Sequence, residues 1–413
     1  MASPASLWRH RDFLLLWVGQ SVSRVGDQFT GLAIPVIAAY TLGAGPTEMG
    51  LLGAAGTFPF LLFGLLVGVW VDRHQHRSVL ILADLGRGTM IATIAGLGLV
   101  GLLGLAHLYI FAFSIGVLTV FFDVAYQAYM PALVERNQLV DANSKLEATN
   151  SLAGIAGSAA AGAVIQLFRA PVAMIIDALS FFFSAGTLGA IRKRQPAADP
   201  KGRRSVFHEV VEGLSIVAKD ARLRHIAACT AWSNFFSGVV FSALLILYLK
   251  DLLGFGPAAL GLMFGIGSVG GVVGAVVSSR VAKRIGVGPA IIVGAILFGA
   301  PLLPLPFVSG PLALPLIGAM FFLATIGNLI YNINQVSLRQ AIVPLRLQGR
   351  LNATMRTIVW GTLPLGAITG GLLGNAIGLR PAILVGLAGG AAAFLFVLFS
   401  PVRGLQTIPE QAP

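Results

Sequence analysis

Charged side chains are scarce in this sequence. Only 11% of the 413 residues are Asp, Glu, Lys or Arg, whereas soluble globular proteins average about 25%. Apolar residues make up 56%, and there are 51 glycines besides. A soluble domain of this length could not bury so much apolar surface, so lipid must surround most of it. The composition therefore predicts an all-α integral membrane protein.

Other absences narrow the function. The single cysteine, Cys229, excludes a disulfide framework and a cysteine-based metal site. We find no glycine-rich phosphate loop, no zinc-protease spacing among the six histidines and no nucleophile–base arrangement. These absences argue against an enzyme, and we expect no metal and no cofactor. Because the phosphate loop of ATP-driven proteins is missing, we expect a proton gradient to be the source of energy.

The net charge of +12 could suggest a nucleic-acid partner. However, the basic residues lie in short clusters between apolar runs, which is typical of cytoplasmic loops in membrane proteins. Only Arg169, Lys250 and Arg380 fall in connections on the opposite side. Both termini are therefore expected in the cytoplasm of a bacterial cell, with the protein a monomer in its inner membrane.

Long apolar runs are what the sequence does contain. A helix that crosses a bilayer needs about 20 mostly apolar residues. Twelve such runs are predicted, at 12–40, 47–71, 78–103, 108–134, 143–168, 171–191, 224–249, 257–281, 288–307, 311–338, 350–377 and 380–401. The one long polar connection predicts three parts: a domain at 1–191, a linker at 192–223 with a surface helix near 205–219, and a domain at 224–413.

The two domains repeat one another weakly. GAGPTEMG at 43–50 returns as GFGPAALG at 254–261, and ALVERNQLVDAN at 132–143 returns as AIVPLRLQGRLN at 341–352. A nearly constant offset between two six-span halves indicates a parallel repeat, with a cavity expected between the halves.

Three stretches carry a family resemblance: GVWVDRHQHR at 68–77, FFDVAYQAYMPALVERNQLVDAN at 121–143 and IIDALSFFFSA at 175–185. With them the chain resembles a major facilitator superfamily transporter, and more narrowly the branch of enterobactin-type and macrolide-type efflux proteins. The resemblance implies twelve transmembrane helices in two pseudo-symmetric six-helix bundles.

The loop after the second span fits the family's pattern at four positions, although Gln75 stands where a glycine is usual. The resemblance implies that this loop is a conformational latch made by Gly68, Asp72, Arg73 and Arg77. A charge at a helix end can also meet an opposing helix N-terminus or an arginine. The alternative is that these charges only anchor helix ends and set the topology.

Ionisable residues inside the membrane are costly, at about 2.5–3.5 kcal/mol each on insertion scales, and are candidate functional groups by default. We expect Asp27 or Asp123 to couple proton entry to substrate exit. Glu147 and Arg356 occupy equivalent repeat positions and could form an ion pair between the halves. Structural pairing is favoured for Asp84 with Arg87, and helix packing or capping for Asp177.

Polar residues on cavity-lining spans suggest where substrate binds. The candidates are Gln20, Tyr126, Trp232, Asn234, Asn328, Tyr331 and Asn332. Alternatively, the amides bond neighbouring helices. Aromatic and amide groups with few acids suit a large amphipathic or cationic solute.

The sequence thus predicts secondary active export of an amphipathic small molecule, such as a drug, macrolide or siderophore-like compound, by alternating access and proton antiport. Uptake of a solute, or lysolipid flipping, on the same fold is the first alternative. A membrane sensor or scaffold that transports nothing is the second.

Overall fold

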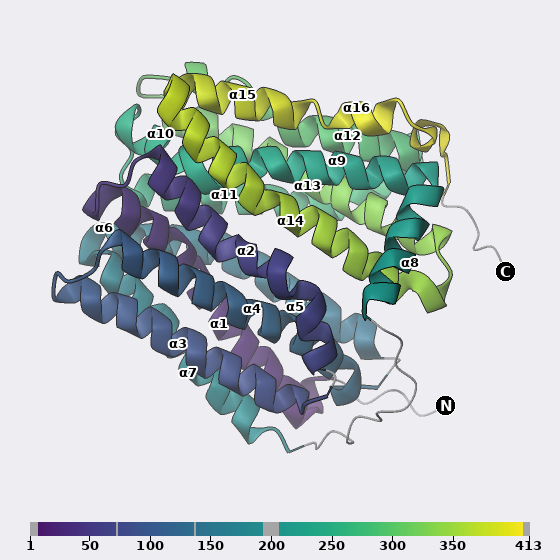
Figure 1. The fold of residues 1–413 in the computed structure, drawn as a ribbon, viewed down its shortest axis with the longest axis horizontal. Coiled ribbons are helices and arrows are strands. Elements are labelled where there is room, and N and C mark those ends of the chain that lie inside the picture. The colour runs from purple at the N-terminus through teal and green to yellow at the C-terminus, as the bar shows by residue number, and fades with distance from the viewer. Residues whose placement is uncertain (1–6, 72, 136–137, 193–205, 408–413) are drawn as a thin grey trace. The chain divides into compact units, whose positions relative to one another are not determined.

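The computed structural model describes residues 7–71, 73–135, 138–192 and 206–407. Long helices joined by short turns make up this part of the chain, and it contains no strand (Figure 1). The prediction of an all-α fold is confirmed. The chain forms two compact units. The N-unit comprises Met1–Gly43, Leu62–Arg203 and Gly256–Gly261, and the C-unit comprises Ala44–Leu61, Arg204–Phe255 and Leu262–Pro413.

The compact units differ from the predicted domains by an exchange of two segments. The first part of the second long helix, residues 44–61, belongs to the C-unit, and residues 256–261 belong to the N-unit. The boundaries at 191 and 224 describe the sequence repeat and stay a prediction.

Helices α1, α3, α4 and α7 form the body of the N-unit, in which α7 packs against both α1 and α3 (Figure 1). A π-helical turn, η4, joins α5 to α6, so that residues 139–168 form one continuous helical run. The elements are η1 (Leu7–Arg9), α1 (Arg11–Val36), η2 (Ile37–Thr41), the end of α2 (Pro46–Val71), α3 (His76–Leu99), α4 (Leu105–Leu133), α5 (Leu139–Leu152), η4 (Ala153–Gly157), α6 (Ser158–Phe168) and α7 (Ala170–Ala190).

Helices α9 and α14 pack together in the C-unit, and the short α8 contacts both of them (Figure 1). The surface helix expected near 205–219 is α8. The elements are α8 (Val206–Lys219), α9 (Ala221–Ser237), η5 (Gly238–Leu244), α10 (Leu245–Asp251), α11 (Pro257–Ile285), α12 (Val287–Gly299), η6 (Ala300–Leu302), η7 (Leu305–Phe307), α13 (Ala313–Ile342), α14 (Leu345–Ile377), α15 (Leu379–Ala391), α16 (Phe394–Leu398) and η8 (Pro401–Gly404).

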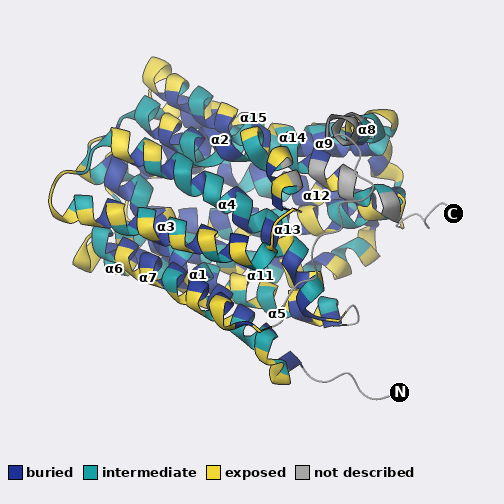
Figure 2. Ribbon diagram, turned by 60° about the horizontal axis from the view of Figure 1, so that its bottom comes forward, coloured by how far each residue is buried: buried dark blue, intermediate teal, exposed yellow. Residues whose placement is uncertain are grey.

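Ten helical segments in the described residues are long and apolar enough to cross a membrane, and they correspond to the third to twelfth predicted spans. Helices α1 and α2 have 26 residues each and occupy the first two predicted spans. The count of twelve stays a prediction. Exposed positions are spread along the helices in Figure 2. Large apolar side chains such as Leu82 and Leu179 are exposed. Outward apolar faces are expected where lipid is the solvent.

The internal repeat is visible in the backbone. Gly43 and Gly254 have φ of 65° and 68°, and each precedes a helix whose first residue is a proline, Pro46 or Pro257. Proline at the first position is suited to a helix start because its missing N–H is not needed there. The two halves therefore use the same turn at equivalent positions.

Candidate functional site

The N-unit contains a polar pocket of about 530 Å³. Helices α1, α4 and α5 supply its walls, which are Gln20, Ser21, Arg24, Tyr126, Asn143, Ser144, Leu146, Glu147, Thr149 and Asn150. We call it the N-pocket. Gln20 and Tyr126 were predicted to line a cavity, and the structure brings them together here with Glu147.

The α5 wall of this pocket was not predicted, although the sequence contains its signal. The segment LVDANSKLEATNSL is far more polar than a lipid-facing helix needs to be. Asn143, Glu147 and Asn150 are spaced i, i+4 and i+7, which places them on one face of α5.

Charged groups of α1 lie at and beside the N-pocket. Arg24 Nη1 lies 3.5 Å from Asp27 Oδ2, and both side chains are partly exposed. Asp123 is half-buried on α4 and is not among the pocket-lining residues. The aromatic ring of Tyr126 stacks on Phe122, with the centroids 5.9 Å apart.

A second polar cluster is buried between α3 and its neighbours. Arg87 Nη2 lies 2.5 Å from Asp84 Oδ1, and both residues are buried. The Arg87 guanidinium also lies over the rings of Phe122 and Phe181, 4.3 and 4.4 Å from their centroids. Aromatic faces attract a desolvated guanidinium, so the guanidinium is held by one carboxylate and two aromatic rings.

The C-unit contains a pocket of different chemistry, about 310 Å³ in volume. We call it the C-pocket. No charged side chain is found among its described lining residues, which are Cys229, Thr230, Ser233, Asn234, Ala295, Phe298, Asn328, Tyr331, Asn332, Val359, Trp360, Leu363 and Ala393. Four predicted cavity residues, Asn234, Asn328, Tyr331 and Asn332, meet here.

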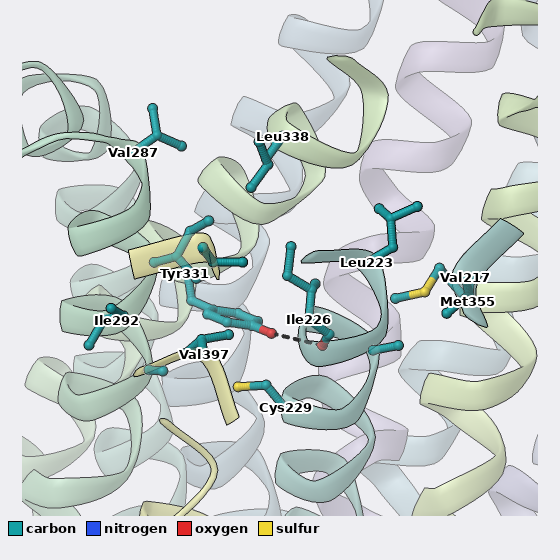
Figure 3. Packing of buried hydrophobic residues seen from close by; sticks show 14 of the residues in the cluster. Val217, Leu223, Ile226, Cys229, Val287, Ile292, Tyr331, Leu338, Met355 and Val397 are labelled. Carbon is teal, nitrogen blue, oxygen red and sulfur yellow. Dashed lines mark hydrogen bonds between the residues drawn. The ribbon is translucent and has the colours of Figure 1, made fainter. Parts of the chain in front are cut away.

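Hydrogen bonds fix several of these side chains. The hydroxyl groups of Tyr331 and Thr230 are 2.7 Å apart, and Asn234 donates to the Val359 carbonyl at 2.9 Å. Asn332 donates to Asn328 one turn away. Figure 3 shows the Tyr331 ring reaching from α13 toward Ile226 and Cys229 of α9, inside an apolar cluster. These hydrogen bonds therefore hold the polar side chains of the pocket in fixed positions.

Trp232 lies apart from the C-pocket. Its ring nitrogen donates to the Gly389 carbonyl at 2.7 Å, and it lines an apolar groove with His225, Phe396 and Phe399. Trp232 and Asn234 are two positions apart, about 200° around a helix, so they face opposite ways.

In the predicted latch loop, Asp72 lies outside the described residues. Gly68 is within α2, Arg73 is exposed, and Arg77 donates to the carbonyls of Leu188 and Gly189 at the end of α7. A cation at a helix C-terminus interacts favourably with unpaired carbonyls. The latch role stays a prediction.

Glu147 belongs to α5 of the N-unit and Arg356 to α14 of the C-unit, and their pairing also stays a prediction. In the described part of the chain, no group of three His, Cys, Asp or Glu side chains could hold a metal ion.

Long apolar helices, an internal repeat and a polar pocket in each unit define a multi-pass membrane transporter rather than an enzyme. The model of the Major Facilitator Superfamily matches residues 16–363. The chain belongs to this superfamily.

Its relatives include transporters of known and unknown substrate. The uncharacterized MFS-type transporter YfiS of Bacillus subtilis (strain 168) is 25% identical over 398 residues, which cover 92% of this chain and 91% of YfiS. The multidrug efflux pump Tap of Mycolicibacterium fortuitum is 26% identical over 380 residues, covering 90% and 91%. Macrolide efflux protein A of Streptococcus pyogenes is 25% identical over 218 residues, about half of each chain.

Solved structures show the same fold. A bacterial homologue of the iron transporter ferroportin, in an inward-facing state, superposes with a TM-score of 0.72 at 18% identity, covering 95% of this chain and 98% of that one. A mutant of the nucleoside transporter NupG gives 0.73 at 11% identity, covering 94% and 99%.

Proposed function

We propose that the chain is a secondary active exporter of amphipathic small molecules, which works by alternating access and exchanges substrate for protons across a bacterial inner membrane. The observation that carries this proposal is the unequal distribution of acids. From residue 221 to the end, the sequence contains only two acidic residues, Asp251 and Glu410. The predicted spans of the first half contain seven: Asp12, Asp27, Glu48, Asp84, Asp123, Glu147 and Asp177.

The C-pocket is suited to an amphipathic solute. Its volume falls at the lower end of the range of about 300–1,000 Å³ that small-molecule sites occupy. Phe298, Tyr331 and Trp360 offer aromatic surface, and the asparagines offer amide donors and acceptors. Because none of the described lining residues is charged, the pocket can hold an apolar or cationic molecule without desolvating a carboxylate.

The N-unit supplies the groups that can exchange protons. Asp27 on α1, beside the N-pocket, and Asp123 on α4 are partly exposed carboxylates. We propose that one of them takes up the proton that drives export. The efflux proteins among the relatives support the direction of transport.

Reconstitution in liposomes tests the proposal. When a pH gradient is imposed, the protein should accumulate erythromycin or ethidium against the concentration gradient of the probe. Asp27→Asn or Asp123→Asn should abolish this accumulation. Gradient-driven accumulation that survives both substitutions would refute the assignment of the acids. If a wild-type protein that is folded moves neither probe but scrambles a fluorescent lysolipid, a flippase becomes the better interpretation.

We further propose that the loop after α2 is a latch that controls the change of conformation. The bonds from Arg77 to the end of α7 support a role in holding this loop. Arg77→Gln should then slow transport severalfold without changing probe affinity. An unchanged turnover would leave Arg77 with only the role of capping α7.

A further inference from the structure

One buried carboxylate takes no part in either pocket. Asp177 lies in the middle of α7, and its side chain is completely buried. Its Oδ1 accepts from Ser180 Oγ at 3.0 Å, but the same hydroxyl lies 2.8 Å from the Asp177 carbonyl, so its single proton is shared. Its Oδ2 has no hydrogen-bond partner. Packing alone gives no reason for a carboxyl here, and the position is too far inside the helix for a cap.

Helix α1 is built to admit this carboxyl. A Cβ at Gly26 would lie 2.4 Å from Asp177 Oδ1 and 2.1 Å from Ser180 Oγ, so any larger residue would clash with both. One turn further along α1, Thr30 lies beside Asp177. The buried Thr30 Oγ1 also lacks a hydrogen-bond partner at bonding distance.

The site offers an ionised carboxylate too few hydrogen-bond donors. A buried carboxylate that accepts only from one hydroxyl, which also lies beside a backbone carbonyl, is unfavourable. A proton on Oδ2 removes this charge and makes the burial of the carboxyl far less costly.

The surrounding charges favour the same state. Asp27 on α1 and the Asp84–Arg87 pair on α3 are the charged groups that face this region, and α6 contributes no ionisable side chain. Arg87 is already committed to Asp84 and two aromatic rings. Asp27, which lies 3.5 Å from Arg24, adds a negative charge to this region, and a nearby negative charge makes an ionised Asp177 less favourable.

Polar side chains lie along α7 between this site and the N-pocket. Asp177, Ser180 and Ser184 lie on the face of α7 that meets α1, opposite Gly26 and Gly19. Gln20, a wall of the N-pocket, donates to Ser184 Oγ at 3.0 Å.

We propose that Asp177 is a buried proton-binding site of the transporter, which exchanges its proton with water of the N-pocket when α1 and α7 separate, along the face of α7 that carries Ser180 and Ser184. This rests on the proposed proton-coupled function and names a third carboxyl in that function.

Infrared titration of the purified full-length protein tests the site without transport. The wild type should keep the carbonyl band of a protonated carboxylic acid at a pH where exposed acids are ionised. Asp177→Asn should remove that band, and the exposed control Asp251→Asn should keep it. An unchanged band in Asp177→Asn would overturn the proposal. If that variant does not fold, Ser180→Ala replaces it and should move the loss of the band to higher pH, and an unmoved titration would refute the site.

Transport in liposomes tests whether Asp177 couples proton movement to substrate movement. Asp177→Asn should lower accumulation of erythromycin under a pH gradient at least tenfold, while counterflow exchange without a gradient should stay within twofold of wild type. Loss of both activities in a folded variant, or retention of both, would refute the role in coupling. If the wild type shows no gradient-driven accumulation of either probe, the proposed function fails, and the infrared titration still decides whether Asp177 binds a proton.

Discussion

The N-unit and the C-unit share backbone turns but differ in their buried acids: among the described residues, the C-unit buries the charged side chain of Arg339 but no carboxylate. The N-unit buries Asp84, Arg87 and Asp177, and Arg24 and Glu147 line its pocket. The described lining of the C-pocket has hydroxyl, amide and aromatic groups and the thiol of Cys229, together with aliphatic side chains, and none of these groups is charged. A duplicated scaffold can therefore assign two tasks to its halves. A neutral pocket can hold an amphipathic molecule at any pH, whereas carboxylates surrounded by protein can load and release protons.

The largest expected effect concerns the buried pair of the N-unit. Asp84→Ala leaves the Arg87 guanidinium buried without its carboxylate, and breaking such a pair typically costs about 3–5 kcal/mol. Thermal unfolding in detergent should show this as a large fall in the transition temperature. In the C-unit, Asn328→Ala removes a side chain that bonds only to a neighbour on its own helix among its described contacts, and the same scan should show little change. Equal losses in the two variants would refute the contrast between the units.

Close helix crossings should respond alike in both units, because their geometry repeats. A Cβ at Gly261 would lie 2.4 Å from the Ser158 carbonyl in the N-unit, and one at Gly50 would lie 2.5 Å from the Ala367 carbonyl in the C-unit. Gly261→Leu and Gly50→Leu should each destabilise by about 1–3 kcal/mol through overpacking.

Gly56→Leu is the matched control for these two variants, since no atom lies within 4 Å of a Cβ built at Gly56. Thermal unfolding of the three variants checks the prediction. A loss at only one of the two crossings would show that the repeat in sequence is not a repeat in packing.

The helices were predictable because apolar runs and Pro or Gly punctuation are local signals. Pro46 and Pro257 begin their helices where the sequence indicated a break. Long apolar runs, however, do not say which face meets a neighbour. The burial of Asp177 depends on Gly26, which is 151 positions earlier in the sequence, and packing or capping was the role expected for it.

The candidate pockets were predictable only in part for a related reason. Asn234, Asn328, Tyr331 and Asn332 do meet, but no local pattern indicates that Trp360 of α14 completes their pocket. The π-helical turn at Gly238–Leu244 also changes the register of its helix, because each π-turn takes an additional residue. A regular period of 3.6 residues per turn therefore does not predict which side chains share a face before and after such a turn.

Binding in the C-pocket should depend on aromatic surface rather than on charge. The ring of Trp360 lines this pocket and stacks on Phe60, with the centroids 5.0 Å apart. Trp360→Ala should weaken ethidium binding roughly tenfold, which is about 1.4 kcal/mol, and Trp360→Phe should keep most of the affinity. Fluorescence titration of the detergent-solubilised protein measures both. A loss that appears equally in Tyr126→Ala of the N-pocket would contradict the assignment of substrate binding to the C-pocket.

The smallest expected effect concerns the caps at the starts of α1 in the N-unit and α9 in the C-unit. His10 Nδ1 accepts from Phe13 N at 3.0 Å at the start of α1. At the start of α9 the cap is Asp220, whose carboxylate accepts from the backbone of Arg222 at 2.8 Å and from the Arg222 guanidinium at 2.6 Å. The hydrogen bond from the Arg222 side chain holds the pKa of Asp220 below its ordinary value of 3.8.

A carboxyl whose pKa is lowered by folding stabilises the fold above its ordinary pKa, and this stabilisation is lost as the pH falls through the lowered value. Asp220→Ala should therefore cost about 1 kcal/mol at pH 7, the usual value of a capping side chain, and clearly less once the pH has fallen below that lowered pKa, where the neutral carboxyl still offers an oxygen acceptor. Asp220→Asn keeps an oxygen acceptor without the charge, so it should cost less than Asp220→Ala at pH 7, and its cost should shrink with falling pH by the same amount because only the wild type titrates. Thermal unfolding of both variants at several pH values measures this, and a pH-independent cost for Asp220→Ala would show that the ion pair with Arg222 contributes nothing to the cap.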